Sequence, residues 1–131
     1  MKILCKLLFC FFLATALPAL AIGFGQSSLH SSLGEPLKIS VKILSAEEDS
    51  DDNLRFRTAE KDMFKRMKIP YQFEYMNLQF RLERDQKNHA TLFISSSETF
   101  DEPLAHFIVE MTSPQGKQFK EIVAFLELPE K

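Results

Sequence analysis

Side chains able to do acid, base or nucleophilic chemistry are sparse in this 131-residue sequence. Its three histidines, His30, His89 and His106, stand far apart, and its densest group of hydroxyls is the serine run at 95–97. Catalysis requires a base within hydrogen-bond reach of a nucleophile, and none of these residues lies in a frame such as Gly-x-Ser-x-Gly or His-Glu-x-x-His. We therefore interpret them as packed, edge or turn residues and predict no catalytic residue and no enzyme.

Metal and cofactor chemistry is not indicated either. Cys5 and Cys10 lie in the apolar N-terminal stretch, so the rest of the chain has no cysteine for a zinc site or an internal disulfide. The carboxylates between Glu47 and Asn53 superficially suggest calcium, but the run lacks the central glycine and closing glutamate of an EF-hand loop. We predict a solvated loop here, with no metal and no cofactor.

The first 21 residues are typical of a secretion signal. Lys2 and Lys6 precede an apolar run, Pro18 follows it, and Ala19-Leu20-Ala21 gives the small-x-small pattern that signal peptidase requires. Cleavage is predicted after Ala21, which makes the protein periplasmic. An uncleaved anchor is the alternative, although the run is shorter than the roughly 20 residues of a spanning helix, and only in that case do we expect contact with a membrane.

Residues 22–131 are predicted to form one domain, since their number suffices for one hydrophobic core but not for two. Without Lys2 and Lys6, the 16 basic residues of the chain become 14, against 18 acidic ones, which leaves a net formal charge of about −4. Because the basic residues are scattered among acidic ones, nucleic acid is not an expected partner.

The rhythm of apolar residues predicts an all-β fold. Alternation with a period of two indicates half-buried strands, and the segment 59–68 changes to helical spacing before Ile69-Pro70 ends it. The two last strands are apolar on both faces, which places them at the centre of the structure, and the serines at 95–97 are expected in a polar loop. The expected strands are 37–44, 54–58, 76–83, 89–95, 104–111 and 119–128, with 23–34 as a lead-in or edge strand.

Short strands at this spacing, without alternating helices, favour an antiparallel β-sandwich of immunoglobulin-like type with one short helix near 59–68. Such a fold hosts many functions, and without a pocket motif it is best suited to binding other macromolecules, through strand edges or loops.

The chain resembles the N-terminal periplasmic domain of the FimV family of type IV pilus assembly proteins. The resemblance begins with the segment from Gly23 to Leu44, continues through the helix and its proline, and ends with a Glu-Pro-hydrophobic-x-x-Phe-hydrophobic-Val-Glu signature before Pro-x-Gly. It departs from the family at Ser113 and Ile122, where a tryptophan and an aromatic residue are usual. The family-motif positions, interpreted as fold-keeping, are Leu33, Pro36, Leu37, Phe64, Glu102, Pro103, Phe107, Glu110, Pro114 and Gly116.

The resemblance implies a non-enzymatic interaction module with protein partners in the cell envelope, such as pilus or secretin components, and a role in twitching motility. FimV proteins continue into a peptidoglycan-binding module and a membrane helix, whereas this chain matches the first domain alone and is expected to act as a stand-alone secreted copy. Two alternatives remain open: a soluble periplasmic carrier or chaperone-like sandwich that binds exported proteins, and a small hydrolase or inhibitor with an unrecognised site.

Overall fold

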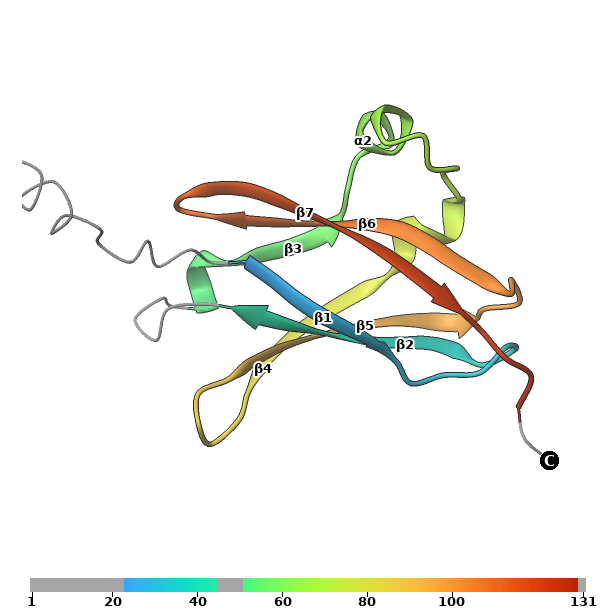
Figure 1. Ribbon diagram of the computed structural model, residues 1–131, viewed down its shortest axis with the longest axis horizontal. Coiled ribbons are helices and arrows are strands. Elements are labelled where there is room, and N and C mark those ends of the chain that lie inside the picture. Colours follow the sequence, from blue (N-terminus) through green and yellow to red (C-terminus); the bar gives the residue numbers. More distant parts are fainter. Residues whose placement is uncertain (1–22, 45–50, 130–131) are drawn as a thin grey trace, which may run out of the picture.

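The computed structural model describes residues 23–44 and 51–129. The predicted signal peptide and most of the carboxylate run lie outside these residues, so both stay predictions. Within the described part, seven strands form two antiparallel sheets that pack face to face (Figure 1). The predicted all-β antiparallel sandwich with one short helix is thereby confirmed.

The first sheet has four strands in the order β1-β2-β5-β4. These strands are β1 (Gly23–Leu29), β2 (Pro36–Leu44), β5 (Ala90–Thr99) and β4 (Gln79–Arg84). Ile39 pairs with Ile94 and Val41 with Leu92, and all four are buried, as the two-residue rhythm predicted. The residues between them point away from the core, so this sheet has one apolar and one polar face.

The second sheet has three strands in the order β3-β6-β7. They are β3 (Arg55–Thr58), β6 (Leu104–Ser113) and β7 (Gly116–Phe125). The β6–β7 turn ends at Gly116, whose φ of 129° is accessible to glycine but strained for other residues. Phe107 pairs with Ile122 on the face that meets the core.

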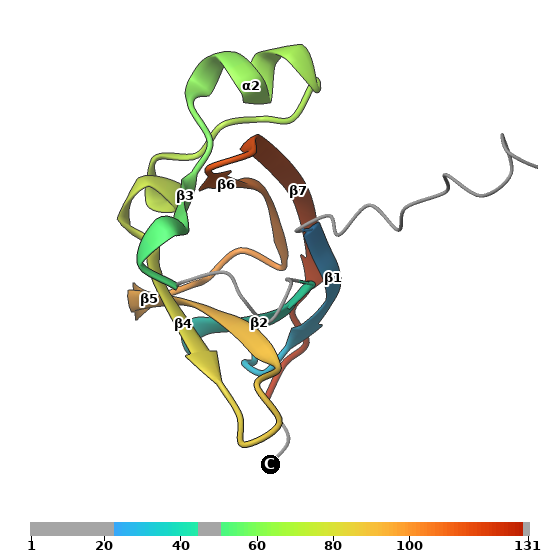
Figure 2. The same cartoon turned by 90° about the vertical axis from the view of Figure 1, so that its left-hand side faces the viewer.

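Between β3 and β4 the chain leaves both sheets and covers the outer face of β6. This covering segment contains α2 (Lys61–Arg66) and the 3-10 turn η2 (Phe73–Asn77), and Figure 2 places α2 beyond the three-stranded sheet. Lys68, with φ 59°, ends the helix, because it lets the N–H of Ile69 reach back to the carbonyl oxygen of Phe64 at 2.9 Å. Another 3-10 turn, η1 (Asp51–Asn53), precedes β3.

Phe64 and Tyr75 fix the covering segment to the body of the domain. The two rings are stacked with their centroids 6.3 Å apart, and both residues are buried. The Tyr75 hydroxyl accepts a hydrogen bond from the backbone N–H of His106 at 3.0 Å, beyond the point where β3 ends. Ile108, which points outward from β6 beside Glu121, is also fully buried.

The two long sides of the sandwich differ. On one side β1 runs beside β7. A Cβ added to Gly23 would lie 3.6 Å from the side-chain oxygen of Gln118. Further along, the N–H of Leu33 donates to the carbonyl of Glu127 at 2.8 Å. On the other side, the edges of β3 and β4 flank an apolar groove of about 470 Å³ lined by Phe56, among others.

Three local predictions were wrong. The strand expected at 76–83 begins at Gln79, because the preceding residues turn to bury Tyr75, which leaves Met76 56% exposed. The serine run is not a loop but part of β5: the β2–β5 register shifts between Pro36 and Lys38, and there the Ser96 hydroxyl accepts the N–H of Leu37 at 2.8 Å.

The third wrong prediction concerns β7, which is an edge strand and not a central one. Its inward residues Ile122 and Ala124 are buried, but its outward residues Val123 and Phe125 are exposed. The apolar residues on both faces of β7 therefore mark one buried face and one exposed apolar face, and not a strand that is buried on both sides.

Candidate functional site

The family-motif positions do not gather in one surface patch. Three of them, Leu37, Phe64 and Phe107, are core residues with at most 1% exposure. Most of the others shape the ends of strands; for example, the carbonyl of Pro103 accepts the N–H of Leu126 at 2.8 Å. The remaining positions are Leu33, half-buried, Glu110, buried, and Pro36, Glu102, Pro114 and Gly116, exposed.

Glu110 is a buried carboxylate on the outward face of β6, 4% exposed. It accepts a hydrogen bond from Nε of Arg57, and Nζ of Lys117 lies 3.8 Å away. Arg57 also contacts Glu60 at 3.2 Å, and the hydrogen bond and charge of Glu110 are the main cause that raises the pKa of Arg57. This network neutralises a buried charge, and it leaves the carboxylate without access to a substrate.

The three histidines lie at separate places. His106 on β6 contacts Glu121 at 2.6 Å, His30 contacts the Ser40 hydroxyl at 2.7 Å, and His89 lies in the β4–β5 turn near Asp85. The contact of His30 with Ser40 is exposed, and the other two histidines contact carboxylates and not a nucleophile in a cleft. In residues 23–44 and 51–129, no group of three or more His, Cys, Asp or Glu side chains is placed to hold a metal ion.

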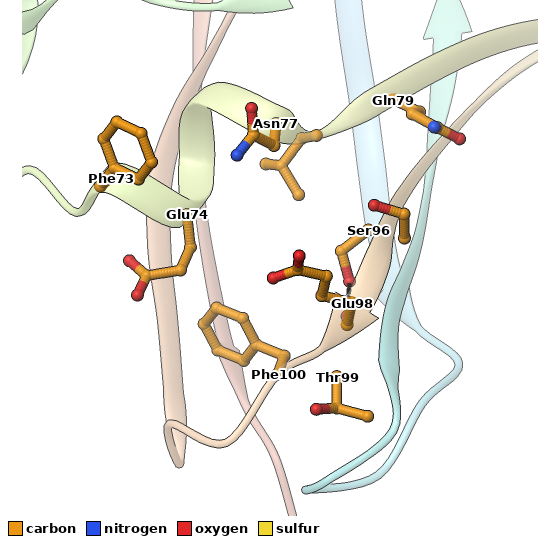
Figure 3. Close-up of a pocket in the computed structure, with 10 residues that line it drawn as sticks. Phe73, Glu74, Asn77, Gln79, Ser96, Glu98, Thr99 and Phe100 are labelled. Carbon is orange, nitrogen blue, oxygen red and sulfur yellow. Dashed lines mark hydrogen bonds between the residues drawn. The ribbon is translucent and has the colours of Figure 1, made fainter.

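A pocket of about 560 Å³ lies between η2 and the end of β5 (Figure 3). Phe73 forms its exposed rim, and Glu74 and Glu98 contribute carboxylates. Its other lining residues are Asn77, Leu78, Gln79, Ser96, Ser97, Thr99 and Phe100.

The pocket of Figure 3 carries negative charge but no catalytic arrangement. The Ser96 hydroxyl is engaged by the backbone, since it accepts from Leu37 and donates to the carbonyl of Glu98 at 2.7 Å. Burial raises the pKa of nearby Tyr75, and the charges of Glu102 and Glu74 raise it further. Because its hydroxyl is engaged by the backbone, Ser96 is not activated as a nucleophile by either carboxylate.

The outward face of β2, β5 and β4 has the opposite charge; we call it the basic face. It contains a hollow of about 590 Å³ around Phe93, whose ring lies 5.4 Å from the guanidinium carbon of Arg81. Its outward side chains are His30, Lys38, Ser40, Lys42, Gln79, Arg81, Glu83, Thr91, Phe93 and Ser95.

The outward face of β6 and β7 is apolar where the covering segment does not reach. Leu104 pairs with Phe125, and Val123 lies opposite His106 in the next outward position. Val123 is 48% exposed and Phe125 73%. We call Leu104, Val123 and Phe125 the apolar patch; exposed apolar groups that are contiguous in this way mark interaction surfaces more often than isolated ones do.

Comparison with known proteins identifies the family. The sequence model of the FimV N-terminal domain, described as an Ig-like domain, matches residues 22–129. The chain belongs to this family. The membership agrees with the two-sheet architecture and confirms the resemblance seen in the sequence, including its immunoglobulin-like fold.

Two curated relatives of this FimV-type domain are the "Motility hub protein FimV" of Pseudomonas aeruginosa strains PAO1 and UCBPP-PA14. Each is 21% identical over 108 residues, which cover 82% of this chain and 12% of the relative. The chain thus spans about an eighth of their length. Among solved structures, the BIgI domain of β protein from S. agalactiae bound to CEACAM1 is 13% identical, with a TM-score of 0.34 over 81% of this chain and 99% of that one.

Sequence reasoning missed both exposed surfaces. The outward position of Phe93 beside Thr91 was visible in the alternation of β5, and Arg81 lies on the preceding strand, but Lys38 comes from a strand 55 residues earlier. The doubly apolar run in β7 was the available signal for the apolar patch. It was assigned to the interior because sequence alone does not show which strands lie at a sheet edge.

Proposed function

We propose that this FimV-type domain is a non-enzymatic interaction module that works in the periplasm, through protein contacts in a motility or cell-envelope assembly. Its family membership and the name of its relatives, motility hub proteins, support this role. Pilus or secretin components are the partners that we propose. The predicted signal peptide supports the location, and no helix in the described residues is long and apolar enough to cross a membrane.

The observation that carries this proposal is the apolar patch. Phe125 and Val123 keep much of their surface in water, although equally apolar residues of the same strand, such as Ile122, are buried. Burying a large apolar side chain in an interface yields about 1.5–3 kcal/mol, and aromatic anchors commonly dominate binding. A partner that covers this patch would gain most of its affinity from these two side chains.

A carrier or chaperone-like role is the second candidate, and the groove between β3 and β4 favours it. The groove is lined by apolar side chains that include Phe56, Met76 and Phe80, and β3 and β4 are edge strands. An extended client could add a strand at such an edge. This role predicts binding to many unfolded exported proteins, whereas an assembly module binds few, folded partners.

The test is deletion of the gene, with surface pili and motility as readouts. Complementation with the natural protein should restore both, and the double variant Val123→Ser, Phe125→Ser should fail. Phe73→Ser, which alters an exposed side chain outside the apolar patch, is the matched control and should complement. Circular dichroism of each purified variant checks folding. If deletion leaves pili and motility unchanged, the motility role is contradicted.

A further inference from the structure

We propose that the basic face docks an acidic, extended segment of a partner protein. The inference rests on the proposed interaction role and goes further by naming a second surface and the chemistry that it recognises. It is built on three strands of one sheet, because Lys38 and Lys42 come from β2, Phe93 from β5 and Arg81 from β4.

The basic face has an excess of positively charged side chains. Lys38, Lys42 and Arg81 point outward, and Glu83 is the one acidic side chain among the outward residues of these three strands in the described part. The chain as a whole has a formal charge of −2, so this face opposes the average. A local positive face on an acidic protein attracts an acidic partner.

The spacing of the charges indicates an extended ligand. Lys38 and Lys42 lie on the same face of one strand with Ser40 between them, so their Cα atoms are separated by roughly 13 Å, four residues of strand rise. The charges therefore do not converge on one small anion. They match carboxylates about four residues apart in an extended segment that lies along β2.

Phe93 gives the face an apolar centre. It pairs with Ser40 on one side and with Arg81 on the other, so a serine, a phenylalanine and an arginine form a row across the three strands. The hollow around this row also includes His30 and Lys38. An aromatic centre within a polar rim is the arrangement of protein interfaces, and apolar side chains of the ligand would lie against Phe93.

Arg81 remains available to a ligand. Its Nε contacts Glu83 at 2.9 Å, but both side chains are more than half exposed, so this ion pair is weak. A partner carboxylate can replace Glu83 without loss of a buried interaction. The guanidinium already lies near the Phe93 ring, which holds it at the rim of the hollow.

The test uses the purified protein as the cell makes it and a synthetic eight-residue peptide of alternating Glu and Thr. NMR titration should shift the backbone amides of β2 and β5 and the ring signals of Phe93. The acidic peptide should bind at least tenfold more tightly than its Lys-Thr counterpart, and its Kd should rise several-fold between 50 and 300 mM salt, as about two charge contacts imply.

Charge reversal then locates the site. The double variant Lys38→Glu, Lys42→Glu should weaken peptide binding at least tenfold, whereas Lys65→Glu, Lys87→Glu makes the same charge change at two exposed residues off this face and should stay within twofold. Phe93→Ala should weaken binding without changing the salt dependence.

Three results would overturn the proposal: equal binding of both peptides, an equal loss in the control variant, or binding to phosphatidylglycerol vesicles in preference to the acidic peptide. The outcome is separable from that of the proposed function. If the natural protein does not bind the acidic peptide but still complements the deletion, only the proposal for the basic face is rejected. If the deletion has no phenotype, only the motility role is rejected.

Discussion

The outer face of the three-stranded sheet is partly covered by another segment of the chain, whereas that of the four-stranded sheet is open in the described residues. The covering segment between β3 and β4 lies over the three-stranded sheet (Figure 2). There the outward residues Ile108 and Glu110 are buried, and Ile108 joins the same hydrophobic core as the inward residues. The outer face of the four-stranded sheet has no such cover within the described residues and is polar and basic around Phe93. Substitutions on the covered face should therefore affect stability, and those on the open face should affect binding.

The largest effect is expected from a substitution that weakens the packing of the covering segment. Phe64→Ala removes a buried ring that contacts the rings of Tyr71 and Tyr75, and the cavity should reduce the free energy of unfolding by about 3–5 kcal/mol. Phe93→Ala, the matched change on the open face, should cost less, because Phe93 is only half-buried. Urea denaturation of both variants measures the difference, and equal losses would contradict the comparison.

A smaller effect is expected from the ion pairs beneath the cover. Glu110→Ala leaves Arg57 and Lys117 without the buried carboxylate, and should cost about 1.5–3 kcal/mol. Glu121→Ala, on the neighbouring strand and more exposed, should cost less than about 1 kcal/mol despite its contact with His106. Thermal unfolding of both variants in low and high salt distinguishes the two contributions, because salt screens interactions with a buried carboxylate less than those of an exposed pair.

The smallest effect concerns one hydroxyl. Tyr75→Phe removes the acceptor of the His106 N–H and should cost about 1–2 kcal/mol at neutral pH. Burial raises the pKa of Tyr75 above its ordinary value near 10, so the folded state keeps a proton that the unfolded chain releases. This contribution to stability is complete below pH 10 and is lost as the pH rises toward the folded-state pKa.

Stability of the natural protein should therefore fall above pH 10, and Tyr75→Phe should fall less steeply. Denaturation midpoints between pH 8 and 11.5 provide the measurement. Parallel pH profiles of the two proteins would show that other groups cause the alkaline loss.

Much of the fold was predictable because strand burial has a local signature. The alternation in 37–44 located β2 and its inward residues, and Ile69-Pro70 marked the end of the helix region. The family-motif residue Glu110 was interpreted as fold-keeping, which stays a prediction; the structure places Arg57 and Lys117 beside it, from 53 residues before it and seven after it. The position of Tyr75 was missed, because a single 3-10 turn has no periodic signature.

The sequence by itself determined the two-residue rhythm, the turns and the family, since each depends on neighbouring residues and their backbone preferences. Only the tertiary structure decided which strands lie at an edge, which outer face the covering segment occupies, and that Lys38 shares one surface with Phe93 and Arg81. The reason is physical: pairing between strands is set by the burial of the whole core, and strands 40 or more residues apart in the chain become neighbours only when that core forms.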